Sequence, residues 1–62
     1  MIKEYRKKKK FTQDELAEII DISTRQLQRI ELDEGRTKIS TIKKLIKVLE
    51  IPDEEILKYI KQ

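Results

Sequence analysis

Four polar side chains on one side of a predicted helix have the types and spacing that suit the edges of DNA bases. They are Thr24, Arg25, Gln28 and Arg29, in a helix predicted over residues 24–32. Arginine pairs with guanine through two hydrogen bonds, glutamine pairs likewise with adenine, and threonine offers a hydroxyl and a methyl group. The set includes no acid and no large apolar group, so we favour base recognition over an ordinary solvated surface.

Two capping boxes predict the helices that would position these side chains. Thr12 is followed three residues later by Glu15, and Ser23 by Gln26. In a capping box the cap hydroxyl accepts from the N3 amide, and the N3 side chain hydrogen-bonds the cap amide in return. We expect one helix after each box, joined by a turn too short for antiparallel packing. This pattern is typical of a helix-turn-helix, whose second helix can enter a DNA major groove.

Apolar residues at helical spacing predict the core. Around the turn, the inward positions are expected to be Leu16, Ala17, Ile20, Ile22, Leu27 and Ile30. Farther along, a fourth helix is predicted by the i, i+3, i+4, i+7 series Ile42, Leu45, Ile46 and Leu49. We expect Ile39 to join this series. Thr37 and Ser40 are both suitable caps for the fourth helix, and the sequence does not decide between them.

Non-glycine residues follow two of the predicted helices where glycine is usual. Lys10 follows a first helix over residues 2–9, and Asp21 follows a second over residues 13–20. We expect both in the left-handed region, at a cost of about 1 kcal/mol for lysine. Gly35, the single glycine of the chain, is expected to adopt this conformation after the third helix.

A fifth helix is predicted after Pro52, which breaks the chain. Its apolar side is expected to carry Ile56, Leu57, Tyr59 and Ile60. Two roles are equally compatible with Leu57, Tyr59 and Ile60. They could form a contact between two copies of the chain, or they could cover the core of a single copy.

Length and composition exclude several classes of function. A chain of 62 residues predicts one domain over residues 1–62 with a modest core. Without cysteine and histidine, it lacks the ligands of zinc sites and the groups of Cys-His or Ser-His-Asp catalysis. We therefore expect no enzyme, no metal and no small-molecule cofactor. No apolar run approaches the roughly 20 residues of a membrane span, and no signal peptide is visible, so we expect a soluble, cytoplasmic protein.

Charge is unevenly distributed along the chain. The totals are 15 basic and 12 acidic residues, a net charge of +3. Residues 1–10 carry six basic side chains and one acidic side chain. All charged side chains of residues 11–22 are acidic, and basic side chains occur again from Arg25 onward. This asymmetry fits a polyanion bound to one face, although composition alone suits a charged, solvated surface equally well.

Four motifs spread over the chain support a family resemblance. They are Ile2-x-x-Tyr5-Arg6, Phe11-Thr12-Gln13-x-x-Leu16-Ala17-Glu18, Ile22-Ser23-x-x-x-Leu27-x-x-Ile30-Glu31 and Asp53-Glu54-Glu55-Ile56-Leu57. Together with the leucine-rich fourth helix, they resemble the lambda-repressor-like, Cro-type helix-turn-helix domains of phage repressors and bacterial regulators. The resemblance implies an all-α, compact five-helix fold with the helix-turn-helix at helices 2 and 3. It also implies a homodimer on a palindromic operator.

The resemblance further implies which residues contact double-stranded DNA. The expected contacts are Gln13 on phosphate and Ser23, Thr24, Arg25, Gln26, Gln28 and Arg29 on bases and flanking backbone. Gln26 also serves its cap, whereas Gln13, Thr24, Arg25, Gln28 and Arg29 are expected to have no structural duty. Arg36 and Lys38, in the loop after the third helix, could reach phosphates. Arg6 is expected to pair with Glu31 and so to fasten the first helix to the reading unit.

Two functions are therefore compatible with the sequence. The leading hypothesis is a sequence-specific DNA-binding transcription regulator, most simply a repressor. The alternative is an antitoxin-type or adaptor module whose main partner is a protein and whose DNA binding is autoregulatory or lost. Asp14, Glu15 and Glu18 could then face a basic partner, although helix-dipole complementarity and lower non-specific DNA affinity explain these acids as well.

Overall fold

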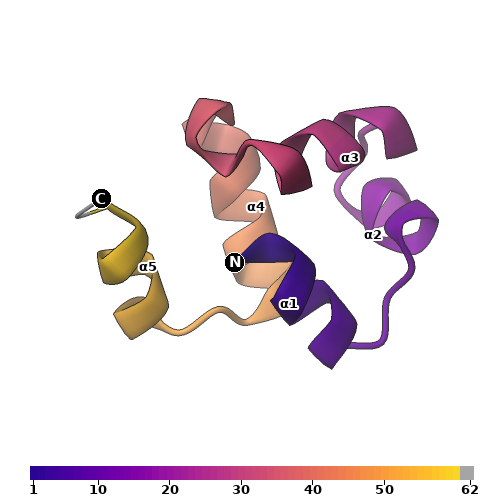
Figure 1. The fold of residues 1–62 in the computed structure, drawn as a ribbon. Coiled ribbons are helices and arrows are strands. Elements are labelled where there is room, and N and C mark those ends of the chain that lie inside the picture. The colour runs from indigo at the N-terminus through magenta and orange to yellow at the C-terminus, as the bar shows by residue number, and fades with distance from the viewer. Residues whose placement is uncertain (61–62) are drawn as a thin grey trace.

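Five α-helices and one short 3₁₀ helix follow one another along residues 1–60. The computed structural model describes the backbone of residues 1–60 and the side chains of residues 1–57. The elements are α1 (Ile2–Lys8), α2 (Gln13–Ile19), α3 (Thr24–Leu32), η1 (Glu34–Arg36), α4 (Ile39–Leu49) and α5 (Asp53–Ile60) (Figure 1). Residues 1–60 contain no β-strand. The prediction of an all-α, five-helix fold is confirmed.

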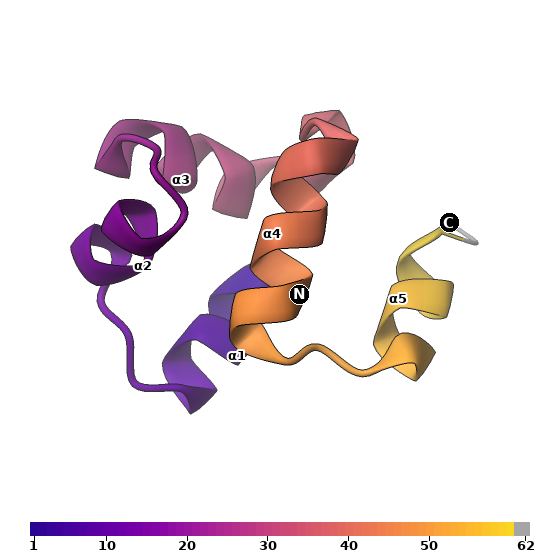
Figure 2. The ribbon, with the colours of Figure 1, turned by 180° about the vertical axis from the view of Figure 1, so that it is seen from behind.

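The helices divide the molecule into three parts. The contacting helix pairs include α2 with α3 and α1 with both α3 and α4. Figures 1 and 2 agree that α2 and α3 lie at one end, that α1 and α4 lie in the middle, and that α5 lies at the other end. The helix-turn-helix therefore rests on α1 and α4, whereas α5 is joined to α4 by a short extended segment.

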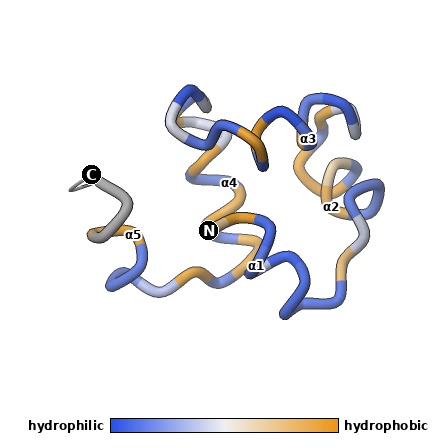
Figure 3. Tube along the Cα trace, viewed as in Figure 1, coloured by the Kyte–Doolittle hydropathy of each residue, from blue (hydrophilic) through white to orange (hydrophobic). Residues whose placement is uncertain are grey.

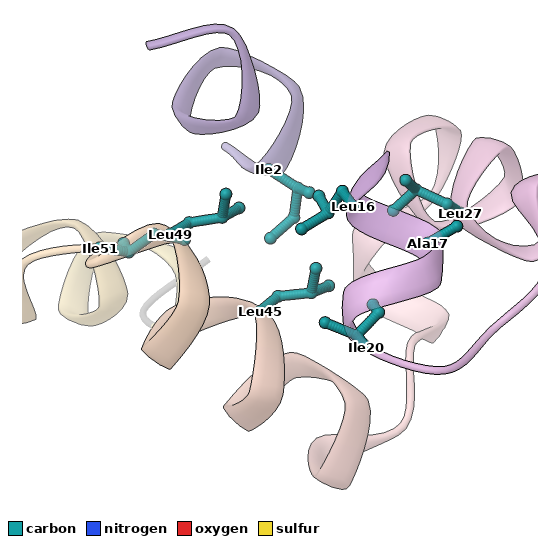
Figure 4. Packing of buried hydrophobic residues seen from close by; sticks show 8 residues of the cluster. All are labelled: Ile2, Leu16, Ala17, Ile20, Leu27, Leu45, Leu49 and Ile51. Carbon is teal, nitrogen blue, oxygen red and sulfur yellow. The ribbon is translucent and has the colours of Figure 1, made fainter. Parts of the chain in front are cut away.

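The core lies where α1, α2, α3 and α4 meet. Its buried members are Ile2, Leu16, Ala17, Ile20, Leu27, Leu45, Leu49 and Ile51 (Figure 4). Burying one such leucine or isoleucine side chain contributes about 1.5–3 kcal/mol. The predicted inward positions on α2, α3 and the second half of α4 are confirmed, and Ile22, Ile30, Ile42 and Ile46 are partly buried against the same cluster.

The last turn of α1 is basic, and Figure 3 shows that this end of the helix and the following turn form one hydrophilic stretch.

Two predictions about the start of α4 are wrong. Ile39 is 73% exposed, because it opens the helix at its outer end, whereas the fully buried Leu45 and Leu49 lie in the half beside Ile2 (Figure 4). Neither candidate hydroxyl caps the helix, since the N-cap residue is Lys38 and no side chain bonds there. The hydroxyl of Thr37 is instead buried without a hydrogen-bond partner.

Left-handed residues end three helices. Lys10 (φ 61°) and Asp21 (φ 62°) adopt the conformation predicted for them, and Glu50 (φ 53°) does the same after α4, which was not anticipated. After each of them an apolar residue donates its amide to a carbonyl five residues earlier, as in a Schellman motif. The donors and acceptors are Phe11 to Arg6, Ile22 to Ala17 and Ile51 to Ile46.

The prediction for Gly35 is wrong. No glycine has a positive φ, and Gly35 lies inside η1. The chain leaves α3 through a 3₁₀ turn that any residue can adopt, so this turn does not require the conformational freedom of glycine.

Candidate nucleic-acid interface

Both capping boxes form, and they fix where α2 and α3 begin. The hydroxyl of Thr12 accepts from the Glu15 amide at 3.1 Å, and the Glu15 carboxylate accepts from the Thr12 amide at 2.9 Å. Ser23 and Gln26 repeat this arrangement at 3.1 and 2.9 Å. The Ser23 hydroxyl and the Gln26 carbonyl oxygen are thus occupied by the start of α3. Two residues expected at DNA therefore have a local structural role.

A buried ion pair joins α1 to the end of α3. Nε of Arg6 donates to Oε2 of Glu31 at 2.7 Å, and another guanidinium nitrogen donates to the carbonyl oxygen of Phe11 at 2.9 Å. The two side chains are only 10% and 5% exposed. This is the arrangement that the family resemblance implied. Burial alone would raise the pKa of Glu31, but the hydrogen bonds from Arg6 and Gln13 and the charge of Arg6 outweigh it, and the pKa is lowered.

The ion pair continues to the surface through two glutamines. Nε2 of Gln13 donates to Oε1 of Glu31 at 3.0 Å, and Nε2 of Gln28 donates to Oε1 of Gln13 at 3.4 Å. Gln13 is half-buried and Gln28 is exposed. The expectation that these two side chains have no structural duty is wrong, because the buried carboxylate needs donors and Gln13 supplies one. The amide orientation of Gln13 is thereby fixed.

A third side-chain hydrogen bond between α2 and α3 joins their first turns. Oγ1 of Thr24 donates to Oδ1 of Asp14 at 2.7 Å. Thr24 was also expected to have no structural duty, and this bond corrects that expectation. The two helix starts approach closely enough for a threonine and an aspartate to meet, although ten positions separate them in the sequence.

Arg25 and Arg29 differ from their neighbours on α3. Both are exposed, and within residues 1–57 no group of the protein forms a hydrogen bond or a salt bridge with either guanidinium. Their four-residue spacing places them on one side of the helix. Two unpaired cations with five donors each therefore point into solvent from the exposed side of α3.

Arg36 and Lys38 lie beyond the far end of α3. Figures 1 and 2 show η1 at the end of α3 that is remote from α2. Arg36 is 90% exposed and its Nε lies 3.3 Å from Oδ2 of Asp33, and Lys38 is exposed as well. Arg29, Ile30, Leu32, Asp33, Arg36 and Thr37 line a shallow depression at this end.

A comparison with protein families shows to which family this arrangement of helices belongs. A family model described as helix-turn-helix matches residues 2–56. The chain belongs to the lambda-repressor-like, Cro-type helix-turn-helix family. No curated protein and no solved structure matched the chain. The family supports a DNA-binding role of the transcription-regulator type.

Two further features of this helix-turn-helix protein escaped the sequence reasoning. Lys3 lines a shallow groove together with Gln13, Gln28, Glu31 and Leu32. Its three-residue spacing from Arg6 could have placed it on the same side of α1. Glu34 accepts from the Ile2 amide at 2.7 Å and so caps the start of α1. These residues are 32 positions apart, and no local signal reveals such a contact.

The described part of the chain contains neither a membrane-spanning helix nor a cluster of metal-ligating side chains. None of its helices is long and apolar enough to cross a membrane. No group of three or more metal-ligating side chains occurs among the described residues.

Proposed function

We propose that this helix-turn-helix protein is a sequence-specific transcription regulator that acts as a repressor in the cytoplasm. In this proposal α3 lies in the major groove of double-stranded DNA. The observation that carries it is the pair of unpartnered guanidiniums of Arg25 and Arg29 on the exposed side of α3. Arginine is the side chain that most often reads guanine, through O6 and N7.

The remaining contacts follow from the same docking. Gln28 and Thr24 reach base edges, and Ser23 and Gln26 meet the flanking backbone at the start of α3. Gln13 contacts a phosphate while it holds Glu31. Arg36 and Lys38, exposed at the other end of α3, contact phosphates along the backbone. Such contacts release counterions, so we expect affinity to fall steeply with salt concentration.

We further propose that the protein binds a palindromic operator as a homodimer. Two copies would place their α3 helices roughly 34 Å apart, in successive major grooves. Leu57 of α5 is 56% exposed and is available for a contact between copies. Tyr59 and Ile60, which were proposed for the same contact, have side chains outside the described residues.

Selection of bound sites from a random pool of double-stranded DNA tests this function. We expect enrichment of a palindrome, and a loss of about 1–3 kcal/mol in binding to that site for Arg25→Ala, together with relaxed preference at one base pair. Lys43→Ala, an exposed cation on the outer side of α4, is the control. Equal weakening on all sequences would assign Arg25 to phosphate binding.

A protein partner is the second candidate, and it is favoured by three exposed apolar side chains. Ile19, Leu32 and Ile39 are 50%, 88% and 73% exposed. An antitoxin-type or adaptor module would bind its partner through exposed apolar side chains of this kind. Failure of the purified protein to retard any DNA at low salt would favour this alternative, because non-specific binding is strongest there.

A further inference from the structure

We infer that Asp14 fixes the Thr24 hydroxyl as a hydrogen-bond acceptor and thereby makes the protein prefer a base with an amino group in the major groove, adenine or cytosine. The inference rests on the proposed function and adds a residue that the expected DNA contacts did not include. The sequence alone suggests for Asp14 a basic protein partner, helix-dipole complementarity or a lower non-specific DNA affinity, but no part in base preference.

The geometry starts from the contact between the two helix beginnings. Thr24 donates its single hydroxyl proton to Oδ1 of Asp14 over 2.7 Å. Asp14 is exposed and Thr24 is half-buried. Arg25, with its unpaired guanidinium, follows Thr24 directly in the chain. The hydrogen-bonded pair therefore lies beside the side chain that we place at the bases.

The bond to Asp14 changes what Thr24 can offer to DNA. A hydroxyl has one proton to donate and two lone pairs to accept with. A free threonine can therefore donate to guanine or thymine oxygens or accept from an amino group. Once its proton is committed to a carboxylate, which cannot donate in return, only the lone pairs remain. Thr24 then acts as an acceptor.

An acceptor distinguishes among the bases of the major groove. Adenine N6 and cytosine N4 are the only base donors there, whereas guanine and thymine present acceptors alone. An acceptor facing another acceptor leaves both unsatisfied, which weakens binding. We therefore expect adenine or cytosine at the base position that Thr24 approaches.

The charge of Asp14 acts in addition. An exposed carboxylate close to the DNA backbone repels phosphates, and this repulsion affects every sequence equally. It lowers non-specific binding, and the specific site compensates through the amino-group contact of Thr24. Discrimination of this kind penalises wrong partners as well as rewarding the right one.

Three variants of the full chain test the inference in the same selection from a random double-stranded DNA pool. Asp14→Ala releases the Thr24 proton. Asp14→Asn keeps an oxygen that accepts from Thr24 but removes the charge. Glu18→Ala, an exposed acid on the same helix, removes an equal charge elsewhere and serves as the control.

We expect the wild-type site to contain adenine or cytosine at one position in each half. The ratio of affinities for the preferred and the other bases at this position, roughly 5- to 150-fold for one mismatched base pair, should approach one in Asp14→Ala, while the preferences at the other positions are retained. Asp14→Asn should keep the preference and bind every sequence more tightly by a similar factor. Glu18→Ala should leave the selected site unchanged.

Several results would overturn the inference. An unchanged site in Asp14→Ala would assign the Asp14–Thr24 bond a purely structural role, and the proposed function would stand. If the wild-type chain enriches no sequence, the proposed function and this inference fall together. Circular dichroism checks the fold of Asp14→Ala. If Asp14→Ala is unfolded, Asp14→Asn decides. Unchanged affinity and unchanged base preference in Asp14→Asn would contradict the repulsive role of Asp14. Loss of the base preference would contradict the acceptor role of Thr24.

Discussion

The helix-turn-helix and α5 are attached to the core in different ways. The reading helix α3 is held by a buried leucine, by the ion pair of Arg6 with Glu31, and by hydrogen bonds from both of its ends to α2. The described part of α5 contributes the partly buried Ile56 and an exposed Leu57. Polar contacts with fixed directions orient a helix more narrowly than apolar contacts do, which suits a helix that must fit a groove.

The largest effect is expected from breaking the ion pair. Arg6→Ala leaves the carboxylate of Glu31 buried without its main partner, which should lower the free energy of unfolding by about 3–5 kcal/mol. Urea denaturation followed by circular dichroism measures this loss. Lys7→Ala, which removes an exposed cation from the same helix, is the matched control. A similar small loss in both variants would mean that the ion pair does not hold α1 to α3.

Acid should weaken the same connection without a mutation. The pKa of Glu31 is lowered in the folded protein, so the carboxylate stabilises the fold above its unfolded pKa of about 4.3. This stabilisation is lost as the pH falls through the lower folded pKa, because the protonated acid no longer pairs with Arg6. Urea denaturation between pH 5 and pH 2 should therefore show a smaller decline for Glu31→Gln than for the wild type. An equal decline would contradict this assignment.

A smaller effect of opposite sign is expected at the end of α1. Lys10 has a φ of 61°, a conformation that glycine adopts without steric cost. Lys10→Gly should raise the free energy of unfolding by about 1 kcal/mol at most, since part of the gain is offset by the entropy of glycine in the unfolded chain. Thermal unfolding measures it. Lys8→Gly, inside the helix, should be destabilising instead.

The smallest effect on stability is expected in α5. Leu57 is more than half exposed, so Leu57→Asp should change the free energy of unfolding of one copy by less than about 0.5 kcal/mol. If α5 joins two copies, the same substitution should shift the protein from dimer to monomer in sedimentation equilibrium. Loss of stability without a change in oligomeric state would place Leu57 in the monomer core.

Much of the helix-turn-helix could be predicted because its signals are local. Each capping box spans four residues, and each apolar stripe repeats within one helix, so the starts of α2 and α3 and the inward positions Leu16 and Leu27 were correctly predicted. The positive φ of Asp21 was predictable for the same reason, since it depends on where one helix ends.

The candidate interface was less predictable because its side chains meet across distant positions. Thr24 and Asp14 are ten residues apart, Gln13 and Glu31 eighteen, and the Glu34 cap on Ile2 thirty-two. From the side-chain types alone, no structural role was expected for Gln13, Thr24 and Gln28. Only the packing of α2 on α3 showed that they also bind one another or their neighbours.

The sequence by itself determined the five helices, the capping boxes of α2 and α3, the inward positions of α2 and α3 and the family, because these depend on periodicity and on residues a few positions apart. The tertiary structure decided which polar side chains are left for a partner. Hydrogen-bonding groups that come close in the fold satisfy one another first, and on α3 this leaves the guanidiniums of Arg25 and Arg29 as the cations that still lack a partner within the described residues.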